Sequence, residues 1–137
     1  MPPEDPEWSP FLECTFLSVL ESADEGIIAF DRDGRCRMIG RRAGELFGIE
    51  PAALVGQTRV EVLRTLAASC EEPEAFLHAV AANDLLEPPK IVAEVDLRRP
   101  RPRTVVWATF PILNEGTAWG RLALVRDVTR ERSAERA

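Results

Sequence analysis

The hydrophobic positions of the chain follow two periods, and the change between them marks the predicted elements. From Phe11 onward, apolar residues recur at three- and four-residue steps, which predicts an amphipathic N-terminal helix over 11–25. The ten residues before it contain four prolines, so we predict a disordered tail over 1–10. From Gly26 the apolar runs become short and are separated by turn residues, which is typical of strands.

A β-hairpin followed by short helices is predicted next. Apolar runs at 26–31 and 36–40 flank an Asp-Gly pair, and glycine accepts the positive φ of a tight turn. Glycines and prolines then divide the chain into short helical patterns. Their predicted ranges are 41–48, 51–56, 60–66 and a helix that opens at Pro73.

Three longer strands are predicted in the last third of the chain, where the period returns to two. Their ranges are 91–97, 104–113 and 119–128, and short loops join them, so antiparallel neighbours are expected. Together with the hairpin they predict an α+β fold with a five-stranded antiparallel sheet. The short helices would cover one face of this sheet, and the N-terminal helix would cover the other.

The apolar side chains of these elements predict a core whose pocket is filled or small. The residues expected to face the core and to line any pocket are Ile28, Phe30, Met38, Leu46, Phe47, Leu54, Leu66, Phe76, Val92, Phe110, Leu122 and Leu124. Trp107 and Trp119 are predicted to pack between the sheet and the N-terminal helix. A dimer interface is the alternative for them, because tryptophan is enriched at interfaces.

Charge is unevenly distributed along the chain. The formal net charge is −6, but residues 1–25 hold seven acidic side chains and no basic one, so the remainder is close to neutral. Nucleic acid is not an expected partner, because general binding to it needs concentrated Lys and Arg. No window approaches the roughly 18–20 apolar residues of a membrane span, and the acidic, proline-broken start does not resemble a secretory signal.

Cysteine and histidine usage limits the chemistry further. Cys14, Cys36 and Cys70 are widely spaced and form no C-x-x-C motif. A disulfide framework or structural zinc is therefore not expected, and reduced thiols fit a cytoplasmic protein. There is no phosphate-binding loop, dinucleotide-binding motif or nucleophile elbow, and His78 is the one histidine. We therefore expect no enzymatic activity in this chain.

Motifs at both ends of the chain carry a resemblance to a known family. Residues 26–58 read GIIAFDRDGRCRMIGRRAGELFGIEPAALVGQT, with an Asp-x-x-Gly-type turn, a helix that ends in Leu-Phe-Gly and a later Leu-x-Gly. Residues 119–136 read WGRLALVRDVTRERSAER and contain an Asp-Val-Thr junction at the end of the last strand. With the spacing between them, these segments resemble a PAS sensor domain.

The resemblance implies a PAS domain over 26–129, followed at 130–137 by the start of a C-terminal signalling helix. That helix has no terminal cap, so we expect it to continue toward a downstream effector domain. The resemblance further implies a cytoplasmic regulatory module of a bacterial two-component system. A sensor histidine kinase is the first choice of effector, and a diguanylate cyclase or a transcriptional regulator is the alternative.

The expected mechanism is a change in packing between helices and sheet, caused by a small ligand or a partner, that reorients the exit helix. The implied signal junction is Asp127-Val128-Thr129. Either Asp127 or Thr129 can cap the helix there, and Arg126 and Arg130 flank the carboxylate and are positioned to pair with it.

Two alternatives to this function stay open. One is a ligand-free module that forms a homodimer through residues 11–22 and the outer sheet face. The other is a haem-based redox or gas sensor, because haem-binding relatives place their proximal ligand on the helix that holds His78; a partly exposed helical histidine is the plainer interpretation. A flavin adduct is not expected, since the Asn-Cys-Arg-Phe-type motif of the light-sensing branch is absent.

A short basic run lies between two of the predicted strands. It consists of Arg98, Arg99, Arg101 and Arg103 with two prolines among them. Such a run favours a solvated hairpin loop over an anion or partner site. No aromatic residues stand among the arginines for base stacking.

Overall fold

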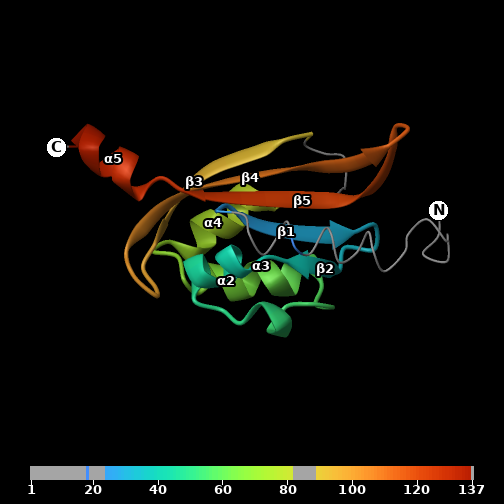
Figure 1. Cartoon of the computed structure of the whole chain (residues 1–137), viewed down its shortest axis with the longest axis horizontal. Helices are drawn as coiled ribbons and strands as arrows, with labels where there is room; N and C mark the ends of the chain where they lie inside the picture. Colours follow the sequence, from blue (N-terminus) through green and yellow to red (C-terminus); the bar gives the residue numbers. More distant parts are fainter. Residues whose placement is uncertain (1–17, 19–23, 82–88, 137) are drawn as a thin grey trace.

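Five strands form one antiparallel sheet in the computed structural model, which describes residues 18, 24–81 and 89–136 (Figure 1). The strand order is β2–β1–β5–β4–β3, so the first and last strands are neighbours in the middle of the sheet. The strands are β1 (Gly26–Asp31), β2 (Cys36–Ile39), β3 (Ile91–Leu97), β4 (Arg103–Asn114) and β5 (Thr117–Asp127). The predicted tail 1–10 and most of the predicted helix 11–25 lie outside the described residues.

The short helices gather on one face of the sheet, and the exit helix extends beyond its end (Figure 1). The elements are α2 (Arg41–Phe47), η1 (Pro51–Ala53), α3 (Arg59–Ala67), α4 (Pro73–Val80) and α5 (Thr129–Arg136). The predicted α+β architecture is confirmed, although the helix predicted over 51–56 is only the 3₁₀ turn η1. Within the described ranges, no helix has the length and apolar character needed to cross a membrane.

Close packing of α2 on β1 positions the arginines of α2. A Cβ atom on Gly26 would lie 3.0 Å from the Cα atom of Ala43, so glycine is what lets helix and strand approach. At its other end α2 stops at Gly48, whose φ of 70° is left-handed. The Ser69 hydroxyl donates to the backbone oxygen of Phe47 at 2.8 Å, which ties this end of α2 to the segment after α3.

Trp107 of β4 is the centre of the core, which lies between the sheet and the short helices. Its side chain is 1% exposed. It meets Phe47 of α2 and Phe76 of α4 edge to face, with ring centroids 6.3 and 5.3 Å apart. The prediction that Trp107 packs toward the N-terminal helix is therefore wrong. Trp119 is partly exposed, and the Arg32 guanidinium lies over its ring at 4.6 Å.

The predicted core residues divide between the two faces of the sheet. Those buried between sheet and helices are Ile28, Phe30, Leu46, Phe47, Leu54, Leu66 and Phe76. The prediction is wrong for a second group, which lies on the outer face: Met38, Val92, Phe110, Leu122 and Leu124. Successive side chains of a strand point to opposite faces, and both faces of these strands are apolar, so the pattern did not indicate which set faces inward.

Candidate functional site at the start of the exit helix

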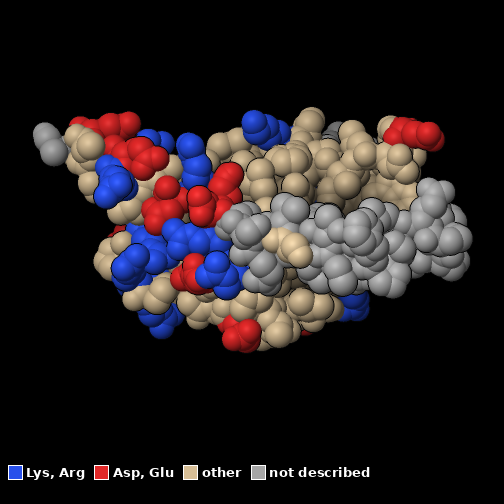
Figure 2. Space-filling model, in the orientation of Figure 1, with Lys and Arg blue, Asp and Glu red and all other residues tan. Residues whose placement is uncertain are grey.

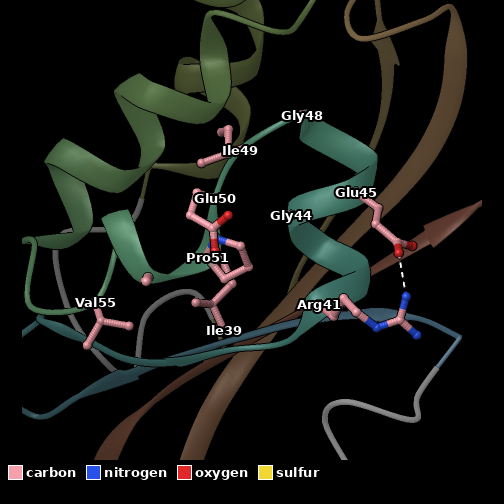
Figure 3. Close-up of a pocket in the computed structure, with 10 residues that line it drawn as sticks. Ile39, Arg41, Gly44, Glu45, Gly48, Ile49, Glu50, Pro51 and Val55 are labelled. Atoms are coloured by element: carbon pink, nitrogen blue, oxygen red, sulfur yellow. Dashed lines mark hydrogen bonds and ion pairs between the residues drawn. The ribbon is translucent and has the colours of Figure 1, made fainter.

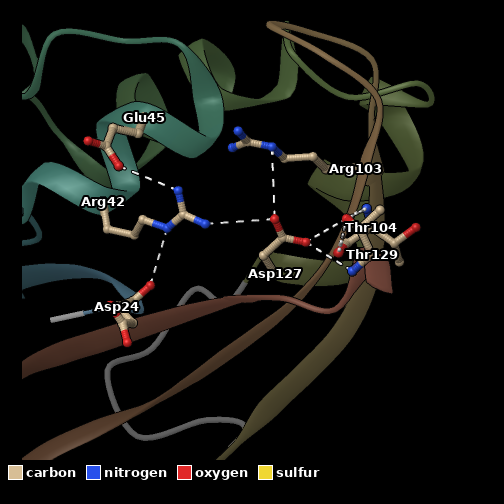
Figure 4. Close-up of polar contacts among 7 residues, drawn as sticks. All are labelled: Asp24, Arg42, Glu45, Arg103, Thr104, Asp127 and Thr129. Atoms are coloured by element: carbon tan, nitrogen blue, oxygen red, sulfur yellow. Dashed lines mark hydrogen bonds and ion pairs between the residues drawn. The ribbon is translucent and has the colours of Figure 1, made fainter. Parts of the chain in front are cut away.

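Asp127 ends β5, Thr129 begins α5, and their side chains are hydrogen-bonded to each other (Figure 4). The backbone N–H of Thr129 donates to Oδ1 of Asp127 at 2.9 Å, and the Thr129 hydroxyl donates to the same oxygen. The first amides of a helix have no partner within the helix. The Asp127 carboxylate supplies one, as a capping side chain does.

The start of α5 is also attached to β4 and β3. The backbone N–H of Thr104 donates to Oγ1 of Thr129 at 3.0 Å, and the backbone N–H of Val128 donates to the Thr104 oxygen at 2.8 Å. One turn along the helix, the Arg132 guanidinium donates to the Glu94 carboxylate of β3. These contacts together set the direction in which α5 leaves the sheet.

Two arginines flank the second oxygen of the Asp127 carboxylate, Oδ2. Nη2 of Arg42 on α2 lies 3.8 Å from it, and Nε of Arg103 on β4 lies 3.9 Å from it. Figure 4 shows that Arg42 also reaches the Glu45 carboxylate and the backbone oxygen of Asp24, at 3.4 and 3.2 Å. One carboxylate thereby connects the helix α2, the strand β4 and the helix α5.

The pKa of the Asp127 carboxyl lies below its usual value. Partial burial acts to raise this pKa, but the two hydrogen bonds from Thr129 and the charges of Arg103 and Arg42 outweigh it. A carboxyl whose pKa is depressed in the folded state stabilises the fold above its unfolded-state pKa of about 3.9. That contribution is present at neutral pH and is lost as the pH falls through the folded-state pKa.

The ion-pair partners of Asp127 differ from Arg126, the neighbour that the sequence suggested. Arg126 is exposed and points to the opposite face of β5, since consecutive strand residues alternate. The structure instead brings Arg42 and Arg103 to the carboxylate. Arg103 could have been found from the two-residue period of β4, which places it on the same face as the buried Val105 and Trp107.

The core holds a buried arginine that the sequence pattern did not single out. Arg121 is 1% exposed, and its Nε donates to the Thr109 hydroxyl at 2.9 Å. Burial lowers the pKa of Arg121, and burial together with the charge of Arg121 lowers the pKa of Arg59 on α3. The burial of Arg121 could have been inferred from the two-residue period of β5, because Arg121 lies on the same face as Ala123 and Val125. The inner face of the sheet therefore carries positive charge beside the apolar core.

His78, the haem candidate, lies on the exposed side of α4. The inward side of this helix presents Phe76 and Val80, and Phe76 packs on Trp107. An axial haem ligand must point into the space that the macrocycle occupies. The position of His78 does not fit that role.

The two described cysteines, Cys36 and Cys70, are free and buried. Burial raises the pKa of each thiol to about 11; for Cys36, the Asp31 carboxylate acts in the same direction and a hydrogen bond to the Met38 backbone opposes it. Both thiols are therefore protonated at neutral pH and are weak nucleophiles. In the described ranges, no cluster of His, Cys, Asp or Glu could hold a metal ion.

A surface groove of about 740 Å³ lies between α2 and η1 (Figure 3). Ile39, Ile49 and Val55 give it apolar walls, and Arg41 and Glu45 stand at its edge, paired with each other. None of the residues predicted to line a pocket borders it.

The strand order, the helices on one face and the capped junction after β5 are the features of a PAS fold. Comparison with known proteins gives the same result. The family model of the PAS fold matches residues 20–133. The chain belongs to the PAS family. It is 30% identical over 125 residues to the sensor protein kinase WalK of Staphylococcus aureus (strain Newman), covering 87% of this chain and 18% of that kinase.

Solved PAS structures show the same fold at low sequence identity. The PAS domain of Bordetella pertussis BvgS is 21% identical, with a TM-score of 0.61 over 95% of this chain and 96% of that one. The PAS domain of a Colwellia psychrerythraea protein is 17% identical, with a TM-score of 0.59 over 87% and 98% of the two chains. The chain is thus a regulatory domain of the sensory type, and it spans less than a fifth of the length of its kinase relative.

Proposed function

We propose that this chain is a cytoplasmic regulatory domain of a bacterial sensor histidine kinase, and that it relays packing changes to a downstream effector through Asp127, Val128 and Thr129. One observation carries the proposal: the Asp127 carboxylate contacts α2 through Arg42, β4 through Arg103 and the first turn of α5 through Thr129. The relationship to a sensor kinase supports the choice of effector.

The relay works by a shift between two populations. A ligand or partner that moves α2 against the sheet moves Arg42, which alters the balance of charges on Asp127. Partly exposed ion pairs contribute only about 0–1 kcal/mol each, so a small difference in binding free energy between the two arrangements is enough to change their ratio. The Thr129 hydrogen bonds transmit the change to α5.

The test is Asp127→Ala in the full-length parent kinase. We expect autophosphorylation to lose its response to the signal, because the carboxylate that couples α2 to α5 is gone, while circular dichroism shows a folded domain. Arg126→Ala is the matched control, since Arg126 is adjacent in sequence but exposed on the other face. Asp127→Asn keeps an oxygen that accepts the hydrogen bonds from Thr129 but removes the charge that attracts Arg42 and Arg103. This variant therefore distinguishes the contribution of the helix cap from that of the ion pairs. Unchanged regulation in Asp127→Ala would refute the relay.

We infer a second role, homodimerisation through the outer face of the sheet. The observation that favours it is the apolar character of that face, where Val92 and Ile112 are 59% and 37% exposed. Phe110, Leu122 and Leu124 lie on the same side, and an apolar patch of this kind marks an interaction surface. Residues 11–22, the other part of the predicted interface, lie outside the described residues except for Ser18.

Sedimentation at increasing protein concentration tests the dimer. We expect Val92→Asp to weaken self-association by at least about tenfold, since a charge would be desolvated in the interface. Val60→Asp on α3 is the control, because Val60 is equally exposed, at 56%, on a helix of the covered face. A wild-type chain that stays monomeric at all concentrations would contradict this role.

A further inference from the structure

Arg103 differs from the other arginines of its basic run. Arg98, Arg99 and Arg101 are exposed, and the backbone N–H groups of Arg98 and Arg99 donate to the Ser69 oxygen, which folds the loop back toward the end of α3. The Arg103 side chain is 9% exposed and extends toward Asp127 (Figure 4). The expected solvated loop therefore ends in a buried guanidinium.

Two nitrogens of this guanidinium lack an acceptor. Nε and Nη1 of Arg103 are buried and have no hydrogen-bond partner in the described part of the chain. The nearest carboxylate oxygen, Oδ2 of Asp127, is 3.9 Å from Nε, which is too far for a hydrogen bond. Buried donors are almost always satisfied in native proteins. The site therefore lacks an acceptor that something else must supply.

The charges around Arg103 favour an anion as that acceptor. Figure 2 shows basic side chains at this end of the molecule, with acidic side chains among them. Burial, Arg101 and Arg42 lower the pKa of Arg103, while Asp127 and Glu45 partly oppose them. The charged groups that act on Arg103 are the guanidiniums of Arg42 and Arg101 and the carboxylates of Asp127 and Glu45. With Arg103 itself, the local net charge is +1.

We propose that Arg42 and Arg103, with Arg101 at the rim, bind a small oxoanion beside the signal junction. The chemical class is a phosphate or carboxylate group, because two guanidinium forks suit its oxygens and bind them with charge-assisted hydrogen bonds. Nε and Nη1 of Arg42 are held by the Asp24 backbone and by Glu45. Oδ2 of Asp127 lies 3.8 and 3.9 Å from the two guanidiniums, so Nη2 of Arg42 and the buried nitrogens of Arg103 are the donors for the anion. The bound anion supplies the missing acceptors.

Anion binding opposes the Asp127 ion pairs. The anion and the Asp127 carboxylate carry the same sign of charge and share Arg42 and Arg103, so each weakens the binding of the other. The hydrogen bonds from Thr129 go to Oδ1 and stay in place. Binding itself does not depend on the proposed signalling role; its effect on α5 does. The site is distinct from the interior, where Arg121 lies.

Thermal unfolding of the chain at pH 7 tests the binding. Phosphate is titrated against sodium chloride at matched ionic strength, and acetate forms a second arm that distinguishes phosphate from carboxylate recognition. We expect phosphate to raise the midpoint saturably, by about 3–6 °C at concentrations well above the dissociation constant. Equal midpoints in phosphate, acetate and chloride would overturn the proposal, since water would then satisfy Arg103.

Three substitutions and one control test whether the phosphate-induced rise in the unfolding midpoint comes from binding at Arg42 and Arg103. Arg42→Gln and Arg103→Gln should each reduce the phosphate-induced shift at least about threefold, and Arg98→Gln, an exposed arginine of the same loop, should leave it unchanged. Asp127→Asn should tighten phosphate binding at least about threefold by calorimetry, because it removes the competing charge. This last variant keeps the proposal testable if Arg103→Gln fails to fold. Equal loss in Arg98→Gln, or weaker binding in Asp127→Asn, would refute the site.

Discussion

Trp107→Ala is expected to destabilise the domain by about 3–5 kcal/mol, the range for truncating a large aromatic side chain in a core. Trp107 is the largest fully buried side chain among the described residues, and Phe47 and Phe76 both meet its ring edge to face. Truncation removes both aromatic contacts and leaves a cavity that two short helices and a sheet cannot close. Because a small domain has only about 5–15 kcal/mol of stability, the loss is a large part of the total.

Urea unfolding followed by circular dichroism measures this effect. Trp119→Ala is the matched control, since Trp119 is partly exposed and its ring is covered by the Arg32 guanidinium. We expect the control to cost about 1 kcal/mol or less, as for a surface position with one cation–π contact. Equal losses in the two variants would show that the core is not organised around Trp107.

Gly120→Ala is expected to have the second-largest effect, by breaking the pairing of β1 with β5. Gly120 lies opposite Asp31 in the register, and a Cβ atom on it would lie 2.0 Å from the Phe30 carbonyl oxygen. That atom belongs to the backbone of the neighbouring strand and cannot rotate away. Separating the strands costs about 1–3 kcal/mol or more, as for overpacking, and exposes β1 to hydrogen exchange.

Gly34→Ala is the control for Gly120→Ala, because it tests the cost of a left-handed backbone without any steric clash. Gly34 has a φ of 80°, and no described atom would lie within 4 Å of a Cβ there. We expect this variant to cost about 1–2 kcal/mol, the usual penalty for a left-handed residue with a side chain, without faster exchange in β1. If Gly120→Ala left the exchange of β1 amides unchanged, the close approach of the two strands would be disproved.

The order of elements could be predicted because it depends on local signals. Turn glycines such as Gly34, helix-stopping glycines such as Gly48 and the change of period after residue 90 are all visible in a single sequence. The sheet was also inferable, because five apolar strands of this length need a common face. The pairing of β1 with β5 joins residues nearly a whole chain apart, and no local pattern in the sequence indicates it.

The faces of the strands and the partners of Asp127 could not be predicted in the same way. Leu122 and Leu124 of β5 alternate with Ala123 and Val125, and neither set is polar enough to mark the solvent side. Arg103 belongs to a run that looks solvated, and its burial depends on how the loop folds back. Partners that come from α2 and β4 are a property of the tertiary structure.

The adjacency of β1 and β5 brings the start of the first strand and the end of the last strand to the same end of the sheet. Gly26 pairs with Val125, so any chain that enters before β1 and any chain that leaves after β5 do so at the same end of the sheet. Arg42 touches the residues at both places, the Asp24 backbone and the Asp127 carboxylate. A domain with adjacent entry and exit points can be inserted into a longer protein while the segments before and after it stay close together. On the relay proposed above, a movement before β1 would reach the start of α5 through this one arginine.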